Sequence, residues 1–327
     1  MTPLQFEQRY QSEWDELQKL LTRLHQPRRW RRDPEQAVAG ERVAALYRRS
    51  CEHLALARAR AYPTYLIDRL EQLTADAHQL IYQHAELGLS RLKQMVALDF
   101  PRAVRAHAAY VWLALAVFAI PTLVVGYLVY FRPELILTVV NGSQAAEFER
   151  MYSQAAQSIG RTRDAQNDWA MFGFYIRNNI GIAFQCFAGG LFAGLGSLFF
   201  LAFNGAYGGA VAGYLTEKGL GATFYSFIVT HAAFELTAIV LSGAAGLRLG
   251  HSLLAPGRQS RLQSLVQAAK ESTVIIYGVF VLLLIAAAIE AFWSAATWMP
   301  AIMKYAVAAL CWTGVLCYLT LQGRGAR

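Results

Sequence analysis

The sequence predicts an all-α fold: a polytopic helical membrane protein of about six transmembrane helices, with an N-terminal helical bundle in the cytoplasm. Apolar residues make up 55% and charged residues only 16% of the 327 residues, whereas a soluble domain usually carries about 25% charged residues. More than half of the charged side chains precede residue 108, and uncharged segments of membrane-spanning length follow. The chain therefore divides into a charged head, residues 1–107, and an apolar body, residues 108–327.

Three amphipathic helical patterns fill the head. They cover residues 4–25, 37–61 and 65–98, with apolar side chains at spacings of three and four. Pro27 and Pro63 separate them, because proline ends a helical pattern. Stripes of this kind are typical of helices that pack on one another, so we expect a small helical bundle.

The first membrane span is predicted over residues 108–131. These residues carry no charge, and about 20 apolar residues suffice to cross a bilayer core of about 30 Å. Arg102 and Arg105 precede the span, so the positive-inside rule places the head in the cytoplasm. The polar stretch over residues 132–177 is then expected outside, as an extracytoplasmic helical loop.

The remaining apolar segments complete the membrane part. Residues 178–215 hold no charged side chain and many glycines, and their length predicts two short spans or a hairpin broken near Asn204. Further spans are expected over residues 221–247, 273–296 and 301–321. Six crossings fit these lengths and place both termini in the cytoplasm, whereas five would put a basic face outside.

Glycines recur at spacings of four in the second apolar segment, at Gly190 and Gly194 and at Gly205 and Gly209. Small residues let helix backbones approach closely in lipid. The sequence therefore predicts unusually close helix packing or self-association, and it favours a homodimer.

Polar side chains inside the apolar segments are the candidate functional residues. An ionisable group within a span costs about 2.5–3.5 kcal/mol, so each one needs a partner or a purpose. The set could relay a proton, bind a cation, line a solute path, ligate a divalent metal, or simply hydrogen-bond the helices in register. His231 and Glu235 lie four residues apart, hence on one helix face. The intramembrane polar cluster comprises Asn178, Asn179, Asn204, His231, Glu235 and Glu290.

Lys304 is the other ionisable residue of the later spans. It follows Pro300 closely, near the end of a predicted span, and long basic side chains at such positions commonly extend their charge to the interface. We therefore expect its ammonium to reach the outer membrane surface.

Several function classes find no support in the sequence. It contains no Walker A loop, no dinucleotide-binding glycine motif, and no HExxH or GxSxG sequence, so we predict no catalytic residue, no cofactor and no enzyme activity. The four cysteines lack metal-binding spacing, and no metal site is favoured. Arginines flank Trp30, but near a membrane such a group more commonly contacts anionic lipid than nucleic acid.

An ordered set of motifs resembles the stage II sporulation protein M family. Its pieces are Asn178-Asn179-Ile180, Asn204-Gly205, His231-Ala-Ala-Phe-Glu235, Gly243-Ala-Ala-Gly-Leu-Arg248-Leu-Gly250 and Ile289-Glu290. The resemblance implies a polytopic inner-membrane protein of bacteria, and the founding member works with two partner proteins during engulfment, where peptidoglycan is degraded. The positions that carry over are Asn178, Asn179, Asn204, His231, Glu235, Glu290 and Arg248, the last as a cytoplasmic motif.

Two functions remain open at this point. The first is a membrane scaffold or assembly subunit that holds envelope-associated or cytoplasmic protein partners, with the bilayer body as anchor and the head as docking surface. The second is a transporter or channel component that uses the His/Glu/Asn cluster. Both place the chain in the bacterial inner membrane with the lipid bilayer as its first partner.

Overall fold

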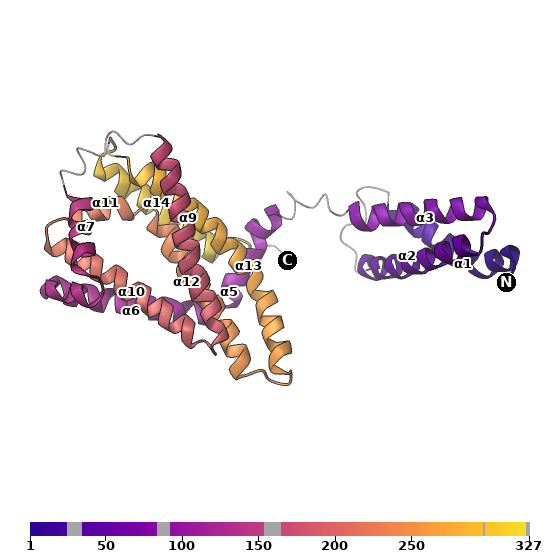
Figure 1. Ribbon diagram of the computed structural model, residues 1–327, viewed down its shortest axis with the longest axis horizontal. Coiled ribbons are helices and arrows are strands. Elements are labelled where there is room, and N and C mark those ends of the chain that lie inside the picture. The colour runs from indigo at the N-terminus through magenta and orange to yellow at the C-terminus, as the bar shows by residue number, and fades with distance from the viewer. Residues whose placement is uncertain (25–34, 84–91, 154–164, 297, 325–327) are drawn as a thin grey trace. The chain divides into compact units, whose positions relative to one another are not determined.

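A computed structural model describes residues 1–24, 35–83, 92–153, 165–296 and 298–324. All regular elements within these ranges are helices, which confirms the predicted all-α class. The chain forms two compact units, the first from Met1 to Leu92 and the second from Lys93 to Arg327 (Figure 1). We call the second unit the membrane body.

The first unit is a three-helix bundle of α1 (Pro3–Leu24), α2 (Glu35–Ala59) and α3 (Thr64–Gln83). The three predicted head patterns are thus confirmed as helices, although the residues after Gln83 that the third pattern included lie partly outside the described ranges. Each helix contacts the other two. The largest side chains that are fully enclosed by the bundle are Phe6, Trp14, Leu17, Leu46, Leu66 and Leu70.

Opposite charges pair across the surface of the bundle. Each pair joins two helices and favours their alignment, but exposure to water keeps the contribution of each pair small. The shortest are Arg42–Glu16 at 2.7 Å, Arg58–Glu71 at 2.7 Å and Arg49–Glu13 at 2.8 Å.

The membrane body combines long helices with several short helical elements. Five helices in the described ranges are long and apolar enough to cross a membrane: α6, α10, α12, α13 together with η6, and α14. The elements are η2 (Met95–Asp99), α5 (Phe100–Ala106), α6 (Ala108–Phe131), η3 (Pro133–Thr138), α7 (Gly142–Tyr152), α9 (Ala165–Ala188), η5 (Gly189–Leu191), α10 (Leu195–Glu217), α11 (Gly221–Ile228), α12 (Ala232–Leu254), α13 (Arg261–Ala288), η6 (Ile289–Ser294) and α14 (Ala301–Leu321).

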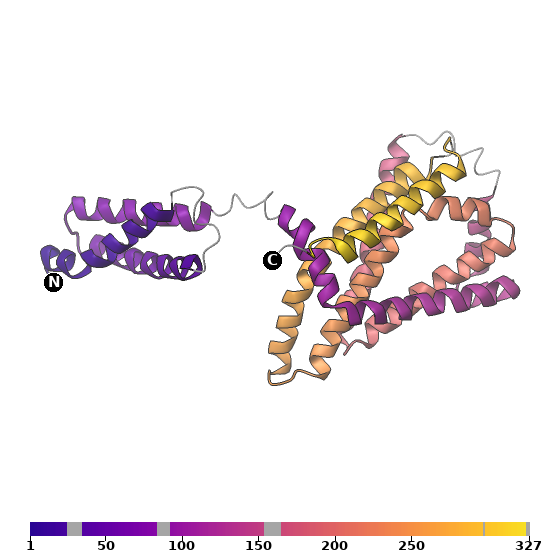
Figure 2. The same ribbon diagram turned by 180° about the vertical axis from the view of Figure 1, so that it is seen from behind.

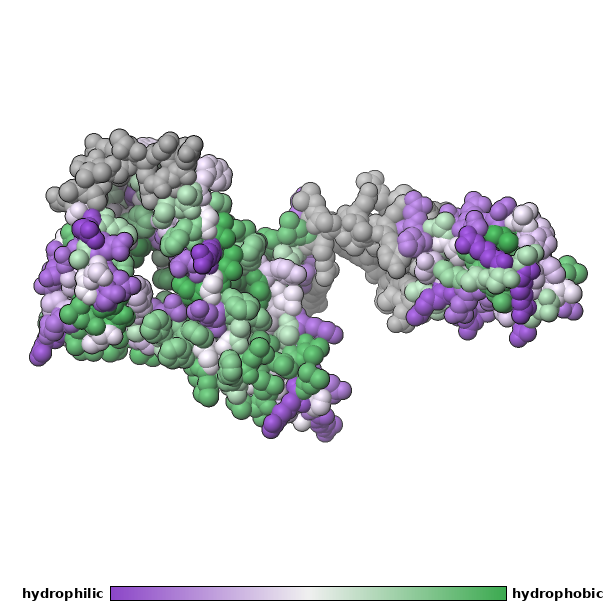
Figure 3. All heavy atoms as spheres, in the orientation of Figure 1, coloured by the Kyte–Doolittle hydropathy of each residue, from purple (hydrophilic) through white to green (hydrophobic). Residues whose placement is uncertain are grey.

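Helix α12 is the centre of the membrane body. It packs against α6, α9, α10, α13 and α14, and most of its side chains are buried (Figures 1 and 2). The outer helices instead expose large apolar side chains, among them Ile120 and Leu123 on α6 and Ile302 and Leu310 on α14. Figure 3 shows hydrophobic areas, in green, on the face of the membrane body turned to the viewer. Lipid is the solvent that such a surface fits.

Helices α6 and α10 lie side by side in extremely close contact. Gly205, Gly209 and Gly213 recur every four residues on α10, so they line one face of that helix. A Cβ atom added to Gly209 would lie 2.2 Å from the carbonyl oxygen of Thr122 on α6. The close helix packing expected from the glycine spacing is therefore present within one chain.

The chain reverses at a different place than the sequence predicted. The break between α9 and α10 lies at residues 189–194, where Ala193 and Gly194 have φ angles of 52° and 86°. Asn204 instead lies inside α10. Glycine adopts a positive φ without steric cost, which explains why the reversal occurs at the densest group of glycines rather than at the amide.

Two other predicted boundaries differ from the structure. Helix α9 begins at Ala165, inside the stretch predicted as a loop, and includes Asp168 in its first turn and Arg177 near its middle. The predicted span over residues 221–247 is divided into α11 and α12 by a break that ends at His231. That break places an imidazole at the start of the central helix.

Candidate functional site

Three ionisable side chains from the predicted cluster converge inside the membrane body. His231 precedes α12, Glu235 lies one turn later on the same helix, and Glu290 lies on η6. One nitrogen or oxygen atom of each lies within 4.8 Å of the others. Nε2 of His231 is 3.9 Å from the carboxylate oxygen Oε2 of Glu235. The helical spacing of four explains the first pair, and only the fold explains Glu290.

The imidazole of His231 is held by a hydroxyl on the opposite side. Its Nδ1 atom forms a 2.9 Å hydrogen bond with Oγ of Ser294, which lies at the end of the π-helical turn η6. Because Nδ1 is occupied, Nε2 is the nitrogen that faces the Glu235 carboxylate. A second group that fixes the orientation of a histidine in this way is common where the other nitrogen binds a proton or an ion.

The expectation that Lys304 reaches the outer interface is wrong. Its side chain is buried, and Nζ donates a 2.8 Å hydrogen bond to the backbone carbonyl of Ser294. The physical reason is the end of η6: the last carbonyls of a helix lack partners within the helix and carry the negative end of its dipole. The first turn of α14 thereby brings a cation beside the residue that holds His231.

Tyr152 is a neighbour of the cluster that the sequence did not reveal. It ends α7, and its ring packs against Phe224 and Phe227 at centroid distances of 5.2 and 6.0 Å. Burial and the nearby charge of Glu290 raise the pKa of the Tyr152 hydroxyl well above its usual range. Tyr152 belongs to a polar segment predicted as a loop, so nothing in its local sequence distinguishes it from other loop aromatics.

A cavity adjoins two members of the cluster. It has a volume of about 560 Å³ and lies between α6 and α10 on one side and α11 and α12 on the other. Figure 3 shows the membrane body hollowed between its helices. Most of its wall is apolar, and Glu235 and His231 lie at the wall formed by α12. Residues lining it include Thr122, Tyr127, Gly208, Tyr225, His231 and Glu235.

The predicted amides do not join the three ionisable residues. Nδ2 of Asn204 donates to the carbonyl of Phe200 at 2.7 Å, so it bonds within its own helix. Asn178 donates to the side chain of the adjacent Asn179 at 2.9 Å, and Asn179 is buried. The recorded contacts therefore reduce the predicted set of six to a core of His231, Glu235 and Glu290.

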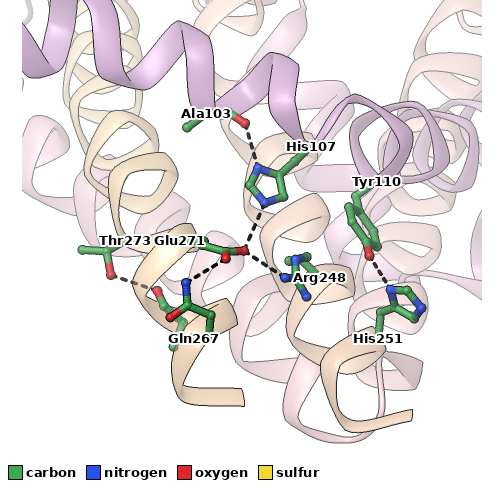
Figure 4. Close-up of polar contacts among 9 residues, drawn as sticks. Ala103, His107, Tyr110, Arg248, His251, Gln267, Glu271 and Thr273 are labelled. Carbon is green, nitrogen blue, oxygen red and sulfur yellow. Dashed lines mark hydrogen bonds and ion pairs between the residues drawn. The ribbon is translucent and has the colours of Figure 1, made fainter. Parts of the chain in front are cut away.

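Arg248 belongs to a second polar group, which ties α5, α12 and α13 together (Figure 4). One of its terminal nitrogens donates to Oε2 of Glu271 at 2.9 Å. His107, at the junction of α5 and α6, places Nε2 3.7 Å from the same oxygen. Tyr110 and His251 form a neighbouring hydrogen bond. The sequence identified Arg248 and missed its partners, because they come from helices distant in the chain.

Chemically, the core cluster can hold one positive charge. Two carboxylates and an imidazole offer acceptors for a proton, and one nitrogen with two oxygens is also a donor set for a divalent cation. The sequence left three interpretations open: structural hydrogen bonding, handling of a proton or cation, and ligation of a metal. The geometry of the cluster is compatible with each of them. The adjoining cavity supplies the space that a transported species would need.

Two family models match the chain. A model described as stage II sporulation protein M matches residues 106–295, which include His231, Glu235 and Glu290. A model described as a domain of unknown function, DUF8413, matches residues 4–83 in the head. No curated protein and no solved structure matches. The first match covers more than half of the chain and confirms the resemblance seen in its motifs.

Proposed function

Because this chain belongs to the stage II sporulation protein M family, we propose that it is an assembly subunit of the bacterial inner membrane. In this proposal the membrane body is the anchor, and the head is a cytoplasmic docking surface for envelope-associated or cytoplasmic proteins. The observation that carries the proposal is the division into two compact units that match two separate family models.

The head has the properties of an independent module. Its core is enclosed by its own three helices, and its surface pairs charges from different helices. An anchor that only had to hold the membrane body in lipid would need no such module. Exposed charged side chains also give a surface that selects partners by electrostatic complementarity.

The proposed topology has six crossings with both termini inside. The proposed sixth crossing is α9, which is 24 residues long and packs along α12 and α13, although it is not among the five helices that are both long and apolar enough to span a membrane. Its charged residues are Asp168, in the first turn nearest the preceding polar segment, and Arg177, near the middle of the helix. With this topology the turn at residues 255–260, which leads into Arg261, faces the cytoplasm.

Cross-linking in cells followed by purification of the full chain tests the assembly role. We expect a protein partner at near-stoichiometric yield, and we expect it to be lost when residues 1–92 are deleted while the membrane body still inserts. A matched control is the charge exchange Glu16→Arg with Arg42→Glu, which keeps the pair between α1 and α2. Recovery of no partner from the intact chain would count decisively against this function.

A second function is favoured by one specific observation, the position of the core cluster beside the cavity. We propose as the alternative that the body handles protons or a small cation through His231, Glu235 and Glu290. A buried carboxylate pair is costly unless it exchanges a proton or binds a cation, and the chain places two carboxylates and one imidazole within 4.8 Å of one another.

Ion flux in proteoliposomes tests this alternative. Glu235→Gln and His231→Ala should abolish flux while leaving the fold intact. Gly208→Leu should do the same by filling the cavity, since no atom lies within 4 Å of an added Cβ there. Gly181→Leu is the matched control, because it adds the same side chain to open space on α9. A Glu235→Gln protein with unchanged flux removes the alternative.

A further inference from the structure

A second hollow in the membrane body is an apolar groove between α13 and α14. It has a volume of about 370 Å³. Helix α14 packs on α5, α11 and α12, and the groove separates it from α13, its neighbour in the chain. Its floor includes Phe234 of α12, so the groove extends inward as far as the central helix. Residues lining it include Val96, Phe234, Val281, Ile285, Gly314 and Tyr318.

One end of the groove is closed by aromatic contacts. The ring of Phe100 lies against Gly278, where an added Cβ would meet it at 2.0 Å. The rings of Phe100 and Tyr318 are stacked with centroids 6.0 Å apart, and the Tyr318 hydroxyl donates to the carbonyl of Val96 at 2.5 Å. These contacts define a closed end, while the wall at Gly314 is open, because no atom lies within 4 Å of an added Cβ.

The chain segments that form the closed end carry several basic side chains. Arg105 donates to the carbonyl of Leu319 at 2.8 Å, and Arg102 donates to that of Gly323 at 3.2 Å. Lys93 and Arg324 add two exposed positive charges, and Asp99 is the single acidic residue in the described segments 93–106 and 318–324. A guanidinium has five N–H donors, so one hydrogen bond to a carbonyl leaves most of them for an anion.

We propose that this groove binds one anionic phospholipid, with an acyl chain between α13 and α14 and the phosphate at the basic end. The apolar wall fits a hydrocarbon chain, and basic groups between membrane helices attract anionic headgroups. The charge complementarity selects this occupant over a zwitterionic lipid. A lipid in this position supplies the packing that α14 lacks on its α13 side.

Lipid binding to the full chain in mild detergent, measured by native mass spectrometry, tests the proposal. The probes are phosphatidylglycerol and phosphatidylethanolamine with identical acyl chains. The wild-type protein should retain phosphatidylglycerol preferentially. Gly314→Leu should weaken that retention about tenfold by filling the groove, and Gly314→Ala should weaken it less. Gly181→Leu, on α9, is the matched control and should leave retention unchanged.

The headgroup is tested separately. Lys93→Gln with Arg324→Gln keeps the hydrogen bonds of Arg102 and Arg105, and it should remove the preference for phosphatidylglycerol by about five- to tenfold. Arg258→Gln, in the turn between α12 and α13, is the control for charge alone. Equal retention of both lipids by the wild type would overturn the proposal.

Two further outcomes would also overturn it. If Gly314→Leu converts a dimer to a monomer without changing lipid retention, a second copy of the chain occupies the groove. If inorganic phosphate displaces the lipid completely, the basic end is an anion site that does not involve the groove. Thermal unfolding of each variant in the same detergent confirms that the proteins compared are folded.

Discussion

At the scale of single residues, His53 couples the stability of the head to pH. Nε1 of Trp14 donates to Nδ1 of His53 at 3.1 Å, and the ring of Tyr10 lies 4.0 Å away, centroid to centroid. A protonated imidazole has no acceptor, so the Trp14 hydrogen bond requires neutral His53. Burial accordingly lowers the pKa of His53 below the ordinary histidine value of 6.5.

The sign of the pH effect follows directly. Because the folded-state pKa is depressed, stability is complete above the unfolded pKa of about 6.5 and is lost as pH falls through the folded pKa. Hydrogen exchange of head amides in the full chain, corrected for intrinsic rates, should show weaker protection at low pH. His53→Leu should flatten this dependence. An unchanged pH profile in that variant would assign the effect to another group.

Lys304 gives a second prediction for a single residue. Lys304→Met keeps the length of the side chain but leaves the Ser294 carbonyl without its buried donor. We expect a loss of stability of about 1–3 kcal/mol, measured as thermal unfolding in detergent. Lys218→Met, at an exposed position beside Glu217, is the control and should stay within about 0.5 kcal/mol. Equal effects of the two substitutions would contradict the burial of Lys304.

At the scale of the elements, the contact of α6 with α10 depends on glycine. Gly209→Ala would place a Cβ 2.2 Å from a backbone oxygen of α6, which cannot rotate away. The helices must separate, at a cost of about 1–3 kcal/mol. Gly208→Ala, one residue earlier, meets no atom within 4 Å and should be neutral or stabilising, because alanine favours the helix. Thermal unfolding of the two variants tests this. A loss of stability in Gly209→Ala alone means that Gly209 serves close packing of α6 on α10, whereas no loss in either variant means that the glycines serve helix flexibility.

The sequence predicted what depends on local pattern. The head helices follow from periodicity, and the spans predicted over residues 108–131 and 301–321 follow from length and lack of charge; the structure has helices in all of these ranges. The reversal at Gly194 was misplaced to Asn204, since a long uncharged segment contains no signal that distinguishes one break from another. Local pattern also cannot reveal a contact made between distant helices.

The candidate site illustrates the same limit. The pairing of His231 with Glu235 follows from helical spacing, and the sequence predicted it. The burial of Lys304 and the approach of Tyr152 depend on how α14 and α7 pack, which no local signal encodes. Asn204 was predicted in the cluster because it is polar in an apolar segment, yet its own helix satisfies it through the Phe200 carbonyl.

At the scale of the whole molecule, the proposed topology makes a direct prediction. Reporter fusions ending at residues 60 and 260 should report the cytoplasm, and a fusion at residue 142 should report the outside, because basic residues flank the inner ends of the spans. A fusion at residue 192, between α9 and α10, should also report the cytoplasm. An external signal at residue 192 would mean that α9 does not cross the membrane.

The π-helical turn η6 limits where residues can be inserted into or deleted from this chain. A π turn accommodates one more residue than an α-helical turn, so Glu290 and Ser294 keep their directions only while that extra residue is present. Deleting one residue between Thr273 and Ala288 would rotate both by about 100° away from His231. A deletion inside the turn would instead leave a regular helix that continues α13. Relatives by descent should therefore vary in length at the ends of this helix and keep the number of residues between its polar groups constant.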